Sequence, residues 1–286
     1  INDYGLRGPE WTLQKPEGVR RIMAVGDSSV YGFGMYDKDV FTALLDVRTG
    51  DQVQVINSAV PGYSSFQTVN LLKIRSLALD PDVLIVGNLW SDNNFDTMVD
   101  REMMAAYGTF GSRTARKVRG ALEVSAAFRA FDYLLRVKSR EPDENKVGWM
   151  EGRPDGGMAR RVEINDYAHN LETMAQLVHE IGGEVMFLVL ANQEDLAPSK
   201  HGPAAWDPYR DVMRDTATRH GSAVVDVPSA FRASGLRGDD LFIDAMHPSA
   251  RGHAIIADAV ESVLLERGWD QGKPLEEDPQ GGSSPQ

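Results

Sequence analysis

The stretch RRIMAVGDSS, residues 20–29, joins an apolar run to a Gly-Asp-Ser turn and decides how the fold is interpreted. Residues 21–25 are nearly continuously apolar, which is typical of a parallel strand buried on both faces. Gly26 allows a sharp turn, and Asp27 and Ser28 follow it at the carboxyl end of the predicted strand. Ligands of open α/β sheets bind at that edge. We therefore expect this stretch to provide one strand of a sheet and one corner of a functional site.

Four further apolar runs repeat the pattern. They span residues 53–57, 83–89, 184–190 and 222–227. Segments with a helical period alternate with the runs, at residues 40–45, 67–79, 167–181, 208–220 and 249–267. This alternation predicts an α/β fold, in which a five-stranded parallel sheet with right-handed crossovers carries helices on both faces.

Two segments depart from the alternation. Residues 98–162 have helical stretches but no good strand, and their 13 Lys and Arg against nine Asp and Glu give them a charge of +4. We interpret them as a mainly helical insertion after the third strand, either a solvated excursion or a lid that recognises an anionic ligand. Residues 270–286 are rich in Gly, Pro, Ser, Glu and Gln and predict a disordered C-terminal tail. Residues 1–269 are then expected to form a single domain.

Composition narrows the function. The chain has 286 residues, of which 42% are hydrophobic, and a net charge of −12. Such an acidic chain is a poor candidate for binding nucleic acid. The lack of cysteine excludes disulfides, a thiolate nucleophile and Cys-based metal sites, and no HExxH or comparable cluster predicts a metal centre. No apolar stretch approaches the roughly 18 residues that span a membrane.

Ser28 is the candidate nucleophile, and its partners lie far away in the sequence. A serine hydroxyl needs a base to take its proton, and that base needs a third group to orient it. The sequence DAMHP, residues 244–248, offers both, because Asp244 can reach the Nδ1 atom of His247 and leave Nε2 free to act as the base. Taken alone, Gly-Asp-Ser also suits a helix N-cap, and His247 also suits a surface histidine before a helix. The two elements together favour a triad of Ser28, His247 and Asp244.

Two more blocks follow the second and third predicted strands. NSAVPGY, residues 57–63, places Gly62 where its backbone N–H can approach a developing oxyanion that a side chain would block. An ordinary strand-to-helix turn is the alternative interpretation. GNLWSDNN, residues 87–94, offers several side-chain donors at the same edge of the sheet.

These four blocks, in this order, resemble the SGNH/GDSL hydrolase family over about residues 20–267, apart from the insertion. The flanking GDSSVYGFG and DAMHPSARGHAIIA and the lead-in NDYGLRG are also similar to the family. The resemblance implies a flavodoxin-like three-layer α/β/α sandwich and an esterase that needs no cofactor. It implies that Ser28 is the nucleophile, that His247 is the general base and acid, and that Asp244 orients His247. The N–H groups of Ser28 and Gly62 would form part of the oxyanion hole.

The third-strand block departs from the family pattern Gly-x-Asn-Asp. Aligned from the preceding Pro-Asp pair, Leu89 stands in place of the glycine and Ser91 in place of the asparagine. Either Ser91 completes the oxyanion hole, or a rearranged loop presents Asn93 or, less favourably, Asn88. One missing donor costs about 10²–10³ in rate, so this block governs how active the enzyme is.

Three functions remain open. The first is a serine hydrolase that cleaves a short-chain or acetyl ester of a glycan or small molecule through an acyl-enzyme on Ser28. The second is an O-acetyltransferase that acts on an envelope glycan with the same triad, and the third is a catalytically weak binding protein. We favour the first. The third is disfavoured because a decayed site has no physical reason to keep Ser28, Asp244 and His247 together, whereas the first two share this triad and differ in whether water or a sugar accepts the acyl group.

The beginning of the chain bears on localisation. It starts at Ile1 rather than Met, and the lead-in resembles the family. We expect an upstream N-terminal membrane anchor or signal peptide, and a location in the cell envelope, the periplasm or outside the cell. The acyl group, the alcohol and the oligomeric state are left open.

Overall fold

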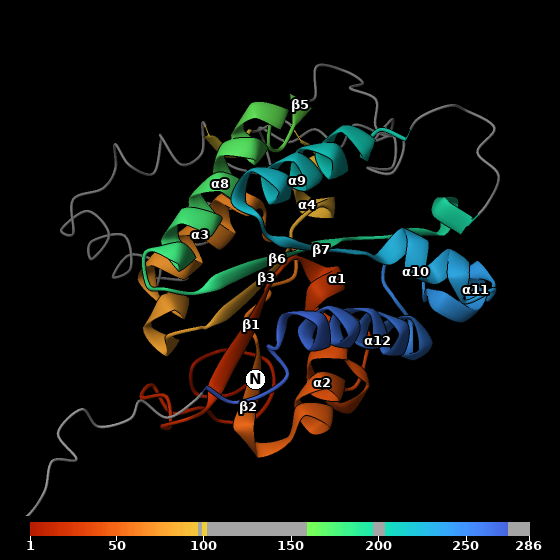
Figure 1. The fold of residues 1–286 in the computed structure, drawn as a ribbon. Helices are drawn as coiled ribbons and strands as arrows, with labels where there is room; N and C mark the ends of the chain where they lie inside the picture. Colours follow the sequence, from red (N-terminus) through yellow and green to blue (C-terminus); the bar gives the residue numbers. More distant parts are fainter. Residues whose placement is uncertain (97–98, 102–158, 197–203, 274–286) are drawn as a thin grey trace, which may run out of the picture.

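The computed structural model describes residues 1–96, 99–101, 159–196 and 204–273. Five strands form one parallel sheet in the order β2-β1-β3-β6-β7 (Figure 1). These strands are β1 (Arg20–Gly26), β2 (Val53–Asn57), β3 (Val83–Gly87), β6 (Glu184–Val189) and β7 (Ala223–Asp226). The predicted five-stranded parallel sheet is confirmed, and each predicted strand ends within two residues of the observed one.

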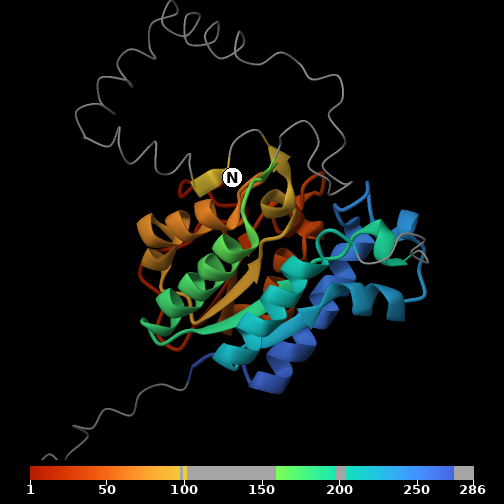
Figure 2. The same ribbon diagram turned by 90° about the horizontal axis from the view of Figure 1, so that it is seen from above.

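Helices cover both faces of the sheet, which confirms the three-layer α/β/α sandwich (Figures 1 and 2). One face carries α3 (Ser65–Ile74), α8 (Ile164–His179) and α9 (Asp207–His220). The other face carries α2 (Phe41–Thr49) and α12 (Ala250–Arg267), and α10 (Val227–Ala233) packs against α12. The short helices α1 (Ser28–Tyr31), α4 (Trp90–Asn93) and α11 (Gly238–Leu241) lie in loops at the carboxyl side of the strands. Sequence periodicity predicted none of these three, because one helical turn is too short to show a period of 3.6 residues.

Local chemistry explains where the long helices begin and end. Ser249 caps α12 by accepting a hydrogen bond from the N–H of Gly252, which satisfies a backbone donor that the helix leaves free. Gly221 and Gly268 end α9 and α12 in the left-handed conformation, which glycine adopts at no steric cost. The apolar sequence of the strands matches their burial, since residues 22–25 of β1 are fully buried.

Two glycines bring the first helix onto the strand ends. Gly26 and Gly87 are paired neighbours at the ends of β1 and β3. A Cβ atom on Gly26 would lie 2.5 Å from the carbonyl oxygen of Gly87 and 2.7 Å from the side chain of Val30 in α1. A Cβ atom on Gly87 would lie 2.5 Å from the same valine. The absence of both side chains therefore allows α1 to sit directly over the sheet edge, with Ser28 as its first residue.

Most of the predicted insertion, residues 98–162, lies outside the described residues, so its helical character and its role as a lid stay predictions. At its end Ala159–Arg160 forms β5, which pairs antiparallel with β4 (Phe95–Asp96). The sequence showed no good strand in this segment, and it gave no sign of this two-residue strand. A strand of two residues is too short to show alternation, and its pairing partner lies more than 60 residues away in the sequence.

The sequence predicted a disordered tail from residue 270, but the structure places residues 270–273 against the body of the protein. Residues 270–273 lie against the start of β1, where the N–H of Lys273 donates to the carbonyl of Gly18 at 2.9 Å and Arg20 donates to the carbonyl of Gln271 at 2.9 Å. Residues 274–286 lie outside the described residues.

Among the helices that the structure describes, none has the length and apolar character required to cross a membrane.

Candidate active site

Ser28 is placed by the turn between β1 and α1. Asp27 caps α1, and its Oδ1 atom accepts a hydrogen bond from the N–H of Ser29 at 3.0 Å. Its Oδ2 atom accepts from the N–H of Trp90 at 2.8 Å, so one carboxylate ties the first-strand turn to the third-strand loop. Burial raises the pKa of Asp27, although these backbone N–H groups lower it in part. Asp27 thus serves as the helix cap that the sequence suggested, and Ser28 occupies the next position.

His247 joins Ser28 to Asp244. Its Nε2 atom lies 2.8 Å from the Oγ atom of Ser28, and its Nδ1 atom lies 2.6 Å from the Oδ2 atom of Asp244. The other oxygen of Asp244 accepts the N–H groups of Met246 and His247, at 2.9 and 2.8 Å. Burial raises the pKa of Asp244, but these hydrogen bonds outweigh it, and the net pKa is lowered. The carboxylate is therefore ionised at neutral pH, and the geometry suits transfer of the serine proton to the imidazole.

The loop that carries His247 is fastened to its surroundings. Ser29, the neighbour of Ser28, donates from its hydroxyl to the carbonyl of Met246 at 3.1 Å. Within the loop, the N–H of Ile243 donates to the carbonyl of His247 at 2.9 Å. The loop therefore meets α1 through a side-chain hydrogen bond as well as through the contact between His247 and Ser28.

Gly62 lies in the turn after β2 with a φ of +79°, a conformation that favours glycine. The turn is braced by Arg161, which donates to the Gly62 carbonyl at 2.7 Å and to the side chains of Asp100 and Gln67 at 2.8 and 2.6 Å. The N–H of Ser28 belongs to the first turn of α1, where a helix supplies no acceptor. Both N–H groups thus belong to turns at the carboxyl edge of the sheet.

The third-strand loop forms α4, and its side chains differ in what they contact. Asn88 donates to the hydroxyl of Thr68 at 3.0 Å, so its amide is engaged in packing α3. Ser91 is half-buried, and its N–H is 3.4 Å from Asp27 Oδ2. Asn93 is a buried residue at the end of α4. Ser91 and Asn93 are therefore the two candidates for a side-chain donor in this block.

A buried carboxylate in the same helix was not singled out by sequence reasoning. Asp92 is fully buried and accepts the N–H of Ser65 at 2.9 Å and its hydroxyl at 2.5 Å, while Asn170 donates to the same hydroxyl at 2.9 Å. Burial raises the pKa of Asp92 to about 7, although the hydrogen bonds from Ser65 lower it in part. Asp92 connects α4 to the start of α3 and to α8, and so fixes the helix that carries Ser91.

Arg7 is a second residue whose role the sequence did not show. Its guanidinium donates to the carbonyls of Tyr31, Gly32 and Met35, at 3.0, 2.7 and 2.5 Å, and to the carboxylate of Asp37 at 2.8 Å. It also stacks over the Tyr31 ring. Arg7 thereby holds the segment that follows α1. In the sequence, Arg7 is noticeable only as part of the lead-in NDYGLRG. That motif does not indicate which distant residues Arg7 contacts.

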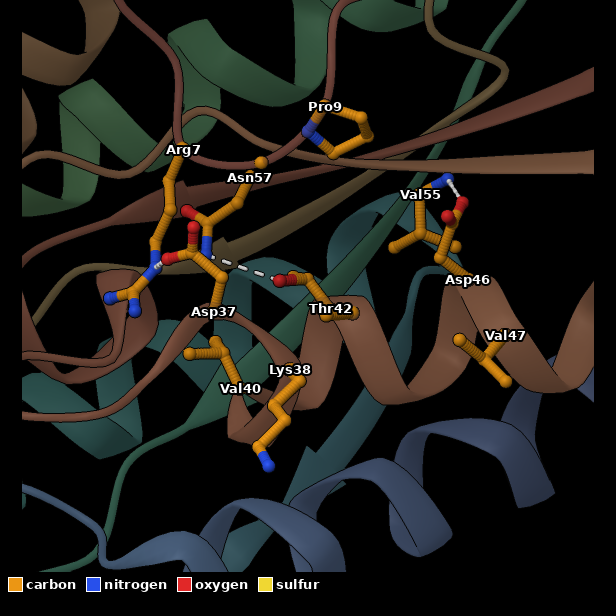
Figure 3. Close-up of a pocket in the computed structure, with 12 residues that line it drawn as sticks. Arg7, Pro9, Asp37, Lys38, Val40, Thr42, Asp46, Val47, Val55 and Asn57 are labelled. Atoms are coloured by element: carbon orange, nitrogen blue, oxygen red, sulfur yellow. Dashed lines mark hydrogen bonds and ion pairs between the residues drawn. The ribbon is translucent and has the colours of Figure 1, made fainter. Parts of the chain in front are cut away.

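A pocket of about 390 Å³ lies apart from the triad, between the N-terminal segment and α2 (Figure 3). Arg7 and Asp37 form an ion pair at one side, and Asn57 donates to the hydroxyl of Thr42 at 3.2 Å across the floor. The carboxylate of Asp46 accepts a hydrogen bond from the N–H of Val55 at 2.8 Å. None of the twelve lining residues is a predicted site residue, and the polar groups named here already contact one another.

Two further histidines in the described part of the chain have partners outside the triad. His253 is buried in α12, where its ring stacks on Phe41, and burial lowers its pKa to about 3. His220 lies 2.9 Å from Glu172 on a neighbouring helix. Among the described residues no group of three His, Asp or Glu side chains lies close enough together to hold a metal ion.

Comparison with known proteins gives the family. Residues 24–255 match the sequence model of the GDSL-like lipase/acylhydrolase family. No curated protein sequence matches the chain. The chain belongs to the GDSL-like lipase/acylhydrolase family and is a carboxylic ester hydrolase.

Solved structures agree with this fold. A lipase/acylhydrolase from Enterococcus faecalis is 16% identical with a TM-score of 0.52, and the match covers 91% of this chain and 100% of that one. LAE5, an α/β hydrolase from the metagenome of Lake Arreo in Spain, is 18% identical with a TM-score of 0.55 over 87% and 95% of the two chains. Axe2, an acetylxylan esterase from Geobacillus stearothermophilus, is 15% identical with a TM-score of 0.53 over 87% and 94%.

Proposed function

We propose that the protein hydrolyses a short-chain acyl ester, such as an acetyl ester, through an acyl-enzyme on Ser28. The observation that carries this is the placement of the His247 imidazole between the hydroxyl of Ser28 and the carboxylate of Asp244. The choice of a short acyl group has support from the similar structures, two of which are acetyl xylan esterases.

The geometry supports a two-step mechanism. The Oγ atom of Ser28 attacks the ester carbonyl while Nε2 of His247 takes its proton, and the ionised Asp244 stabilises the imidazolium. The N–H groups of Ser28 and Gly62, with a side chain from α4, receive the developing oxyanion. The imidazolium then protonates the departing alcohol, and an acyl group remains on Ser28. In the second step His247 activates water, which attacks the acyl-enzyme and releases the acid.

The acyl-enzyme can react with either of two acceptors, since water and a sugar hydroxyl are both oxygen nucleophiles that His247 can activate. Hydrolysis releases the free acid, whereas transfer yields a new ester. Product analysis with and without a glycan acceptor distinguishes them. We expect the free acid to dominate when no acceptor is added.

The test removes the nucleophile. Ser28→Ala is expected to abolish turnover of p-nitrophenyl acetate, because it removes the hydroxyl that forms the acyl-enzyme. Ser262→Ala, which removes a hydroxyl on α12 far from the triad, is the matched control and should retain activity. A fluorophosphonate probe should label wild-type protein at Ser28, as mass spectrometry of the digest would show. Undiminished turnover in Ser28→Ala would overturn the mechanism.

A further inference from the structure

An aromatic side chain lies directly against the histidine of the triad. The ring of Phe33 is centred 5.0 Å from the His247 ring and is tilted by 43° to it. Half of the Phe33 surface, 50%, is nevertheless exposed. Ile243, on the loop before His247, is 47% exposed as well. Large apolar side chains with this much exposure next to a reacting group indicate a surface that receives an apolar part of a ligand.

The segment that carries Phe33 is held in place from both sides. Arg7 donates to the carbonyls of Gly32 and Met35, which flank Phe33 in the sequence. Gly34 has a φ of +78°, and a Cβ atom there would lie 2.6 Å from the end of the Ile243 side chain. The lack of a side chain at Gly34 therefore lets the two segments approach closely. Phe33 is thus presented to solvent by a fixed backbone.

The direction of proton transfer places the alcohol on this side of the site. When the tetrahedral intermediate collapses, Nε2 of His247 gives its proton to the oxygen of the departing alcohol, so that oxygen must lie within hydrogen-bond distance of the imidazole. The rest of the alcohol extends outward from that point. Phe33 is an exposed apolar side chain beside this ring, and the exposed side chain of Ile243 lies against Gly34, the next residue after Phe33.

We propose that Phe33 is a specificity-determining residue, whose exposed ring contacts the alcohol part of the ester and favours a rigid ring alcohol such as a pyranose. This rests on the proposed hydrolysis through Ser28. A half-exposed aromatic ring offers one flat apolar face, and the C–H faces of a sugar ring are flat and apolar in the same way. A short linear alcohol covers little of that face. Because an accepting alcohol attacks along the path by which the first one leaves, the same ring also contacts an acceptor sugar.

The experiment compares two acetate esters that form the same acyl-enzyme but differ in the alcohol: xylopyranose tetraacetate and ethyl acetate. Phe33→Ala should lower kcat/KM for the sugar ester by at least about tenfold, and that for ethyl acetate by no more than about threefold. Phe33→Leu should resemble Phe33→Ala toward the sugar ester, since it lacks a flat face, whereas Phe33→Trp should retain most of the activity. Leu265→Ala, an exposed apolar residue of α12, is the control and should leave both values unchanged.

Two outcomes would overturn the proposal. An equal loss of kcat/KM for both esters in Phe33→Ala would show that Phe33 acts only by positioning His247. Undiminished hydrolysis of the sugar ester would show that its alcohol does not contact the ring. A binding measurement separates this from failure of the hydrolytic mechanism. In the Ser28→Ala background, adding Phe33→Ala should weaken the binding of xylopyranose tetraacetate, observed by NMR titration, by at least about fivefold. Unchanged binding would reject the role of Phe33, whatever the wild-type protein hydrolyses.

Discussion

Asp92 makes the stability of this protein depend on pH in an unusual direction. Its carboxyl group is fully buried, and burial raises its pKa from 3.8 to about 7. Between pH 4 and 7 the folded protein therefore holds a proton that the unfolded chain has lost, so acidification across this range stabilises the folded state. A tenfold change in proton affinity corresponds to about 1.4 kcal/mol, so the full effect of Asp92 is about 4 kcal/mol.

His253 acts in the opposite direction. Burial lowers its pKa from 6.5 to about 3, so below pH 6.5 the unfolded chain binds a proton that the folded protein excludes. Acidification from pH 6.5 to 4 therefore costs the folded state about 3 kcal/mol through this residue. In the wild-type protein the contributions of Asp92 and His253 largely offset each other between pH 4 and 6.5.

The substitution Asp92→Asn separates the two contributions. Asparagine has nearly the same shape and keeps an oxygen that can accept the N–H of Ser65, but it cannot ionise. The free energy of unfolding of the variant, relative to wild type, should fall by about 4 kcal/mol between pH 7.5 and 4, because the variant lacks the stabilising protonation. Urea unfolding, followed by tryptophan fluorescence at several pH values across this range, measures the difference.

A matched control distinguishes burial from charge alone. Asp239 has a side chain that is 83% exposed, so Asp239→Asn should change the free energy of unfolding equally at both pH values. His253→Gln should show the reverse of Asp92→Asn, with a variant that becomes more stable on acidification relative to wild type. A change of less than about 1 kcal/mol in Asp92→Asn across the pH range would refute the reasoning from burial.

Three further predictions concern the triad, the buried arginine and the oxyanion hole. Asp244→Asn should lower kcat for p-nitrophenyl acetate by about 10³–10⁴-fold, since an amide favours the wrong imidazole tautomer; a loss below about tenfold would contradict this. Arg7→Lys should reduce the free energy of unfolding by about 2–3 kcal/mol in urea titrations, because the three N–H donors of an ammonium sit on one atom and cannot reach all four acceptors that the guanidinium spans, whereas Arg237→Lys on the surface should change it little. Of Ser91→Ala and Asn93→Ala, the variant that removes the oxyanion donor should lower kcat by about 10²–10³-fold, and normal rates in both would exclude a side-chain donor from α4.

The strands were predictable because their signal is local. A strand buried on both faces must be apolar along its whole length. Residues 83–87 and 184–189 can therefore be recognised as strands from their own sequence, without knowledge of the strands beside them. The approach of Asp244 to His247 was predictable for the same reason, since only three positions separate them. Short helices such as α4 escaped prediction because Asp27 and Asp92, rather than periodicity, hold them in place.

Other contacts have no local signal. Arg7 meets carbonyls 24 to 28 positions away, and Phe33 meets an imidazole more than 200 positions away. The pKa of Asp92 depends on how completely neighbouring helices exclude water, which the residue type does not encode. The sequence narrowed the side-chain oxyanion donor to a few residues of one block, and the engagement of Asn88 with Thr68 is a contact that only the structure shows.

The sequence by itself determined the alternation of strands and helices, the parallel sheet and the edge at which Ser28 stands, because burial and backbone conformation act over a few residues at a time. The tertiary structure alone decided that a hydroxyl at position 28 lies 2.8 Å from an imidazole 219 residues away. It also decided that the carboxyl group of Asp92 is buried away from water and that the ring of Phe33 lies against the imidazole. These properties depend on the packing of distant segments, and packing is set by the whole fold rather than by any one stretch of the chain.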